Sequence, residues 1–138
     1  MKRNPFRKKQ RLKTNRQFRA VLANKCCSSN KLASLFLAEN NVGFPRLGVS
    51  VSKKCGNSPL RNRIKRMARE SFRLNQHDIG QNYDYLLIFS PKMSKTDKQA
   101  IFSACSELNF EQLNTLFLEL SAAARQKIKR ASANRPAK

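Results

Sequence analysis

Acidic residues are scarce in this sequence of 138 residues, where eight Asp and Glu stand against 29 Lys and Arg. The resulting net charge of +21 makes a compact chain repel itself, so a polyanionic partner is expected. Nucleic acid is the first candidate, and an anionic membrane surface is the second. Tryptophan is absent, but nine Phe and 40% hydrophobic residues suffice for a single small domain with a core.

Long apolar segments are missing too. No run approaches the roughly 20 apolar residues that a transmembrane helix needs, and the basic N-terminus is followed by no hydrophobic stretch of a secretory signal. The four cysteines, at positions 26, 27, 55 and 105, contain no C-x-x-C pair, which argues against a zinc finger. We therefore predict reduced thiols in a cytoplasmic protein.

Groups for autonomous chemistry are equally sparse. The single histidine, His77, lies among polar residues, and the eight acids show no pairing of the kind that a two-metal nuclease site requires. With four glycines in all, the chain also lacks a glycine-rich phosphate loop. We expect no catalytic residue, no metal site and no cofactor bound by the protein alone.

The positive charge is concentrated in three places. Ten Lys and Arg lie in residues 1–25 and six in residues 125–138, both without an acid, while residues 53–73 hold eight with one acid. We predict a basic flexible arm at residues 1–10, a folded domain at 11–120 and a basic tail at 121–138. The two termini are expected to become ordered only on a partner.

Hydrophobic periodicity predicts the order helix, strand, strand, helix, strand, helix, with room for one more short strand. This order indicates an α+β sandwich with helices packed on a sheet. The first two strands should pair as an antiparallel ribbon, and residues 24–31 should form a loop. If the second and third strands pair in parallel, the general rule predicts a right-handed crossover. The expected elements are a short helix capped by Thr14 or Asn15, strands at 32–39, 46–52 and 83–90, a helix at 59–75, and one long helix that begins at a cap, Ser94 or Thr96, and continues into the tail.

The helix at 59–75 is the most informative segment. Ser58 is its expected N-cap, and Pro59 suits the first helical position. At about 100° per residue its side chains separate into an apolar arc and a cationic arc. The apolar arc holds Leu60, Ile64, Met67, Ala68 and Phe72; the opposite arc holds Asn62, Lys65, Arg66, Arg69 and Arg73; Arg61 and Arg63 flank the apolar arc on either side.

A charged helix face is usually a solvated surface, but such faces normally mix the two signs. In this helix Glu70 is the only acid. A membrane-bound helix would need bulky apolar side chains where Ala68 and Ser71 stand. The pattern therefore favours an RNA-binding face, on which arginines bind phosphates with two hydrogen bonds each.

These residues resemble a family signature. Leu47-Gly-Val-Ser-Val-Ser-Lys-Lys54, followed by Arg61-Asn-Arg-Ile-Lys-Arg66 and Arg69-Glu-Ser-Phe-Arg73, is similar to the bacterial ribonuclease P protein component, in which a strand ends in Lys-Lys and precedes an R-N-R-x-K-R-x-x-R-x-x-F helix. The similarity extends from about Arg11 to Phe117. It implies a single-domain α+β sandwich on a mixed sheet, with a left-handed strand–helix–strand crossover, like the second domain of ribosomal protein S5.

The resemblance also implies a function. Proteins of this family bind a catalytic RNA, ribonuclease P RNA, and help it to remove the 5′ leader of precursor tRNA by Mg²⁺-dependent hydrolysis. The RNA holds the metal ions, so the protein is a non-catalytic subunit. The partners implied are ribonuclease P RNA and precursor tRNA in the bacterial cytoplasm, with no membrane and no small-molecule substrate.

Two groups of site residues follow from the resemblance. The residues expected to bind the catalytic RNA are Lys53, Lys54, Arg61, Asn62, Arg63, Lys65, Arg66, Arg69 and Arg73. The residues expected in the cleft for the precursor leader are Phe18, Leu22, Phe36, Gly48, Ser50 and Ser52. Strand alternation independently puts Phe36 on one face with the small residues of the second strand, leaving room for an unstacked base. Phe18 and Phe36 could instead simply pack in the core.

Two other functional classes agree with the composition. The first is a ribosomal or other structural RNA-binding protein, which would bind RNA without affecting cleavage of precursor tRNA. The second is a self-sufficient protein nuclease, which would cleave without any RNA.

Overall fold

The structure is a computed structural model that describes residues 8–23, 26–91 and 98–133. The expected cap at Ser94 or Thr96, most of the basic arm and the end of the tail lie outside these residues. The elements are η1 (Lys8–Gln10), α1 (Asn15–Ala23), β1 (Cys27–Ser29), β2 (Ala33–Glu39), β3 (Arg46–Val51), η2 (Lys53–Cys55), α2 (Ser58–Asn75), β4 (Tyr83–Phe89), α3 (Lys98–Ser106) and α4 (Phe110–Ala133), where η marks a short 3₁₀ helix.

The four strands form one mixed sheet in the order β1-β2-β4-β3. The central strand β4 is antiparallel to β2 and parallel to β3. The predicted antiparallel ribbon of β2 and β3 is therefore wrong, because the nearly continuous apolar run of β4 is buried best between them. The predicted loop at 24–31 contains the edge strand β1, whose backbone pairs with β2 although its side chains are mostly polar.

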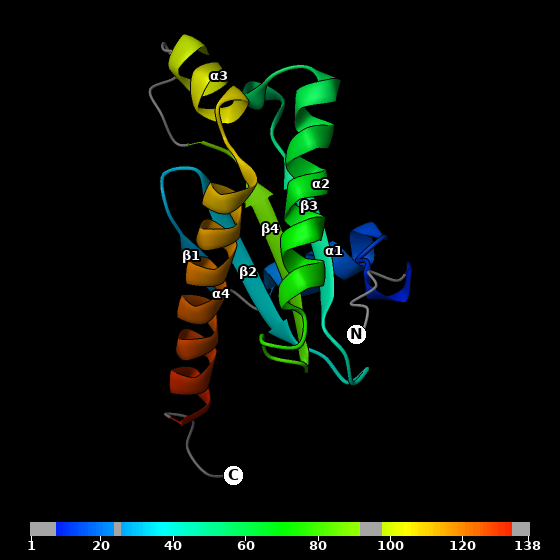
Figure 1. Ribbon diagram of the computed structural model, residues 1–138. Coiled ribbons are helices and arrows are strands. Elements are labelled where there is room, and N and C mark those ends of the chain that lie inside the picture. Colours follow the sequence, from blue (N-terminus) through cyan, green and yellow to red (C-terminus); the bar gives the residue numbers. More distant parts are fainter. Residues whose placement is uncertain (1–7, 24–25, 92–97, 134–138) are drawn as a thin grey trace.

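Helices cover both faces of the sheet (Figure 1). The long helices α2 and α4 lie side by side on the face toward the viewer, α1 lies behind the sheet, and α3 lies beyond its upper end. With α2 in front, β3 on the right and β4 on its left, both running upward, the β3–α2–β4 crossover is left-handed. The general rule of right-handed crossovers fails here, whereas the handedness implied by the family resemblance is confirmed. A right-handed connection would have put α2 on the face that α1 covers.

The main core lies between the sheet and the layer of α2 and α4. Phe72 of α2 meets Tyr85 of β4 and Phe117 of α4 in edge-to-face contacts, with ring centroids 6.2 and 6.4 Å apart. All three rings are fully buried. Such aromatic pairs add stability beyond the area that they bury, so this cluster fixes α2 against both the sheet and α4.

The predicted long C-terminal helix is in fact two helices. α3 ends at Ser106, and α4 begins after a reciprocal cap in which the Gln112 amide donates to Asn109 Oδ1 at 2.8 Å and the Asn109 amide donates to Gln112 Oε1 at 3.0 Å. α4 then continues beyond residue 120 into the segment predicted as tail, where Ala124 and Ile128 are buried in the main core.

Candidate nucleic-acid interface

α2 is amphipathic in the way that its sequence predicts. Ile64, Ala68 and Phe72 are fully buried against the sheet and α4. The helix begins one residue earlier than predicted, because Asn57 acts as the N-cap and its Oδ1 accepts a hydrogen bond of 3.2 Å from the Leu60 amide. Asparagine is as good a cap as serine, so a choice between neighbouring candidates depends on the loop geometry.

The outward face of α2 carries cations that no acid on this helix neutralises. Asn62 and Arg66 are exposed, Lys65 and Arg69 are half-buried, and the four side chains line a hollow of about 630 Å³. Glu70 is paired with Arg73 instead, through a hydrogen bond of 2.9 Å from Nε and a second bond from Nη2. The hydrogen bond from Arg73 lowers the pKa of the Glu70 carboxyl, which keeps this pair charged.

Arg63 has a structural partner that its sequence neighbourhood does not reveal. Its guanidinium donates to the carbonyl oxygens of Ser106 at 3.2 Å and Leu108 at 3.0 Å. These carbonyls lie at the C-terminal end of α3, where a cation is favourable. Arg63 therefore joins α2 to the junction of α3 and α4, besides standing at the edge of the cationic face.

Lys53 and Lys54 are placed at the N-terminal end of α2 by the short helix η2. The Ser52 side chain caps η2 by accepting a hydrogen bond of 3.3 Å from the Lys54 amide. Cys55 is fully buried and anchors η2 in the core, which leaves both lysines exposed. The cationic surface of α2 thus extends to the end of β3.

The segment from residue 8 to residue 13 was missed as part of the interface. It lies along the edge of β3, where the Leu12 amide donates to the Leu47 carbonyl at 2.9 Å. The buried Gln10 side chain donates to Gln76 Oε1 at 2.8 Å and so ties this segment to the end of α2. The only sequence signal for this placement is the family-like Arg-Leu-Lys at 11–13.

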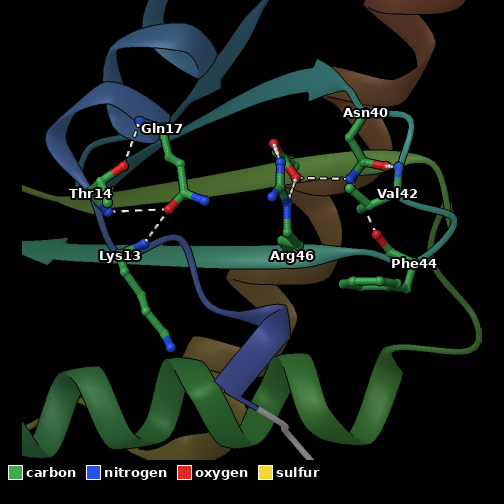
Figure 2. Close-up of polar contacts among 8 residues, drawn as sticks. Lys13, Thr14, Gln17, Asn40, Val42, Phe44 and Arg46 are labelled. Atoms are coloured by element: carbon green, nitrogen blue, oxygen red, sulfur yellow. Dashed lines mark hydrogen bonds and ion pairs between the residues drawn. The ribbon is translucent and has the colours of Figure 1, made fainter.

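This segment adds cations to the α2 surface. Burial and then the nearby charge of Arg11 lower the pKa of the Arg69 guanidinium, so these two arginines repel each other in the free protein. In Figure 2 the side chain of Lys13 extends toward α2. Lys8, Lys9, Arg11 and Lys13 are all exposed. The cationic surface therefore continues from α2 around the edge of β3 toward the opposite face of the sheet.

α1 lies on that opposite face and is held by a capping box. Gln17 Oε1 accepts hydrogen bonds from the Lys13 and Thr14 amides at 2.7 and 3.1 Å, and Thr14 Oγ1 accepts one from the Gln17 amide at 3.1 Å (Figure 2). Of the two predicted caps, Thr14 is the one used. α1 buries Val21 against the sheet, leaves Phe18 half-buried and leaves Leu22 39% exposed.

The predicted leader-cleft residues of the sheet do share one face. The register places Phe36 and Gly48 on either side of Leu86 across three neighbouring strands. The Phe18 ring lies directly over Gly48, since a Cβ atom at position 48 would be 2.5 Å from Phe18 Cε1. The space that Gly48 leaves is thus filled by a side chain of this chain itself.

The rest of this face is only partly covered. Phe36 and Ile88 pack at the margin of the small cluster of Leu12, Val21 and Leu86 and remain half-buried. Ser50 is exposed and Ser52 is half-buried. An aromatic side chain beside small polar groups on a half-open sheet face is a surface on which an unpaired base can stack.

The one acid on this face is neutralised. Arg46 donates to both carboxylate oxygens of Asp84 at 2.7 Å, and Asn40 Nδ2 donates to Oδ1 at 2.8 Å (Figure 2). The hydrogen bond to Asp84 raises the pKa of Arg46. The bidentate pair joins β3 to β4 and removes a charge that would otherwise repel a phosphate chain.

The described ranges contain neither a metal site nor a membrane-spanning helix. No three His, Cys, Asp or Glu side chains in these ranges are grouped so that they could hold a metal ion. None of the helices described there is both long and apolar enough to span a bilayer.

Comparison with known proteins adds independent observations. A sequence model of the family Ribonuclease P matches residues 6–113. The ribonuclease P protein component of Alkaliphilus metalliredigens is 38% identical over 98 residues, which are 71% of this chain and 88% of the relative. That of Clostridium botulinum (strain Loch Maree) is 44% identical over 92 residues, 66% of this chain and 81% of the relative. The structure of the Staphylococcus aureus RNase P protein is similar with a TM-score of 0.64 and 27% identity, over 80% of this chain and 91% of that protein.

Proposed function

The chain belongs to the ribonuclease P protein family, and from this premise we propose that it is the RNA-binding, non-catalytic subunit of ribonuclease P. In this role it binds the catalytic RNA and the 5′ leader of precursor tRNA in the bacterial cytoplasm, and the leader is removed to leave the mature 5′ end.

One observation carries this proposal. A cationic surface begins on α2, where Lys65, Arg66 and Arg69 lie together, and continues through residues 8–13 around the edge of β3. It ends beside the half-open sheet face that holds Phe18 and Phe36. Cations bind phosphates and an aromatic side chain stacks on a base. A surface that joins the two therefore suits a single RNA strand that extends from one bound RNA to the other.

The two parts of this surface have different tasks. The α2 face, with Lys53 and Lys54, binds phosphates of the catalytic RNA through its arginine and lysine side chains. Arg63 acts partly as a positioning residue, since its hydrogen bonds hold the start of α4 against α2. The sheet face receives the leader, with Phe36 as the most accessible aromatic group.

In this proposal the RNA, and not the protein, catalyses the reaction. Mg²⁺ ions held by the RNA promote the hydrolysis, as the family resemblance implies. The protein residues contribute by binding both RNAs and by partly neutralising their charge, which lowers the Mg²⁺ concentration that the assembly needs.

Reconstitution tests the proposal. The purified chain is added to a bacterial ribonuclease P RNA, and cleavage of precursor tRNA is measured at high and at low Mg²⁺. We expect stimulation that is largest at low Mg²⁺ and no cleavage by RNA-free protein. Cleavage by the RNA-free protein would favour the self-sufficient nuclease, whereas binding to ribosomal RNA without any stimulation would favour a structural RNA-binding protein.

A further inference from the structure

Phe102 is an aromatic side chain that the family signature does not include and that the proposed function does not yet use. It lies on α3 and is 44% exposed, and it is the one aromatic residue among the large hydrophobic side chains that are exposed in the described parts of the chain. An exposed phenyl ring costs solvation free energy, so its position relative to the RNA-binding residues is informative.

The ring lies against the backbone of Gly56, between η2 and α2. A Cβ atom at position 56 would be 3.4 Å from both Cδ2 and Cε2 of Phe102, which is van der Waals contact. Gly56 also has a positive φ of 141°, a conformation that other residues rarely adopt. Glycine at this position therefore permits the turn and makes room for Leu60, whose Cδ2 would be only 2.8 Å from a Cβ atom there, with the Phe102 ring beside it.

α3 is fixed in this position by contacts of the residues that follow Phe102. Arg63 binds the carbonyls of Ser106 and Leu108, and Cys105 is fully buried with its thiol hydrogen-bonded to that of Cys55. A ring that is held on a rigid element loses little conformational entropy when a ligand stacks on it.

The surroundings of the ring are cationic. Lys53 and Lys54, both exposed, precede Gly56 by three and two residues, and the first turn of α2 that follows contains no acid. The helix N-terminus adds a partial positive charge to that of the lysines. A half-exposed aromatic ring bordered by cations matches one nucleotide, whose base stacks while its phosphates bind the charges.

We propose that Phe102 is a stacking platform for an unpaired base of the catalytic RNA, with Lys53 and Lys54 binding the adjoining phosphates. This inference rests on the proposed function and extends the RNA interface from α2 to α3. An alternative occupant, the same face of a second copy of this chain, agrees poorly with the charge, because it would bring the two pairs of lysines together.

The test compares the binding of ribonuclease P RNA by four variants of the full chain: Phe102→Ala, Phe102→Leu, Phe102→Tyr and, as matched control, Leu74→Ala. Leu74 is 43% exposed and lies at the far end of α2.

Removal of the ring, by Ala or Leu, should weaken binding roughly 5-fold to 150-fold, the range expected for one stacked base. Tyr and the control should bind like the parent. The salt dependence should stay unchanged in all four, because no charge is altered, whereas Lys53→Ala should lower the salt slope by about one unit.

A fluorescent variant gives a direct readout. The sequence contains no tryptophan, so Phe102→Trp creates a single reporter. Catalytic RNA should quench its emission, whereas the emission of Leu74→Trp in the same assay should stay unquenched.

Three results separate the possible failures. If Phe102→Leu folds with the parent's melting temperature and binds the RNA equally tightly, the stacking site is wrong while the proposed function stands. A concentration-dependent dimer that Phe102→Ala abolishes, seen by light scattering, would identify the face as a protein contact instead. If the parent chain does not bind ribonuclease P RNA at all, both the proposed function and the stacking site are wrong.

Discussion

The ring of Phe18 lies over Gly48, with Cε1 only 2.5 Å from the point that a Cβ atom at position 48 would occupy. This contact joins α1 to the edge strand β3 and sets how closely α1 approaches the sheet. The small residues of this strand were expected to leave room for an unstacked base, but above Gly48 that room is occupied by the Phe18 ring. The accessible part of the sheet face therefore lies near Phe36 of β2 and Ser50 of β3.

Gly48→Ala is therefore expected to displace Phe18. Overpacking of this kind costs about 1–3 kcal/mol of the free energy of unfolding, which urea denaturation measures. The double variant Gly48→Ala/Phe18→Leu should recover part of the loss, since the smaller side chain leaves room for the methyl group. Ser50→Ala, on the same strand and face but exposed, is the control and should change stability little. Equal stability of Gly48→Ala and the parent would contradict the close approach.

Phe36→Ala tests the leader site. If Phe36 stacks on a leader base, the variant should lose about 1–3 kcal/mol of binding free energy for precursor tRNA and none for mature tRNA, which has no leader. Across substrates with progressively shorter leaders, the affinity of the variant should change less with leader length than the affinity of the parent. The melting temperature serves as control, because Phe36 is half-buried and contributes to packing as well. A folded variant that still distinguishes long from absent leaders as well as the parent would exclude Phe36 from the site.

Arg66 and Arg63 provide a matched pair on α2. Arg66→Ala should leave stability nearly unchanged and lower the salt slope of RNA binding by about one unit, as expected for one lost phosphate contact. Arg63→Ala should instead lower the free energy of unfolding by about 1–3 kcal/mol, because two carbonyl groups at the end of α3 lose a charged donor. Identical effects of the two substitutions on stability and on salt slope would contradict this division.

The thiols of Cys55 and Cys105 should be unreactive in the folded protein. Burial, and next the hydrogen bond with the Cys55 thiol, raise the pKa of Cys105 to about 12, and burial also raises the pKa of Cys55. Alkylating reagents attack the thiolate, so at pH 8 iodoacetamide should modify the half-buried Cys27 well before either of them, as mass spectrometry of the peptides would reveal.

The same shift has a consequence for stability at high pH. A neutral thiol is favoured in the folded state, so its stabilisation is complete below the ordinary value of 9.0 and is lost as the pH rises toward about 12. Cys105→Ala should therefore weaken the decline in melting temperature above pH 9. Native Cys105 that is alkylated as fast as Cys27 would contradict the burial of this thiol beside η2.

Local features of the sequence determined most of the secondary structure and the character of the RNA-binding face. The limits of α2 were predicted to within one residue, since caps and a 3.6-residue period act over a few neighbours only. The apolar run of β4 likewise indicated a strand covered on both faces. The outward position of Asn62 and Arg66 followed from the same periodicity.

Tertiary structure alone decided how these pieces come together. Strand order depends on which pairing buries β4 best, so the expected ribbon of β2 and β3 gave way to β4 between them. Arg63 finds its carbonyl partners 43 and 45 residues away, and Gln10 finds Gln76 at a separation of 66. Such contacts leave no periodic trace in the sequence, because they are selected by the packing of whole helices and strands. For this reason composition and periodicity indicated an RNA-binding helix, while the path of the cationic surface around β3 and the position of Phe102 beside Gly56 emerged only from the folded chain.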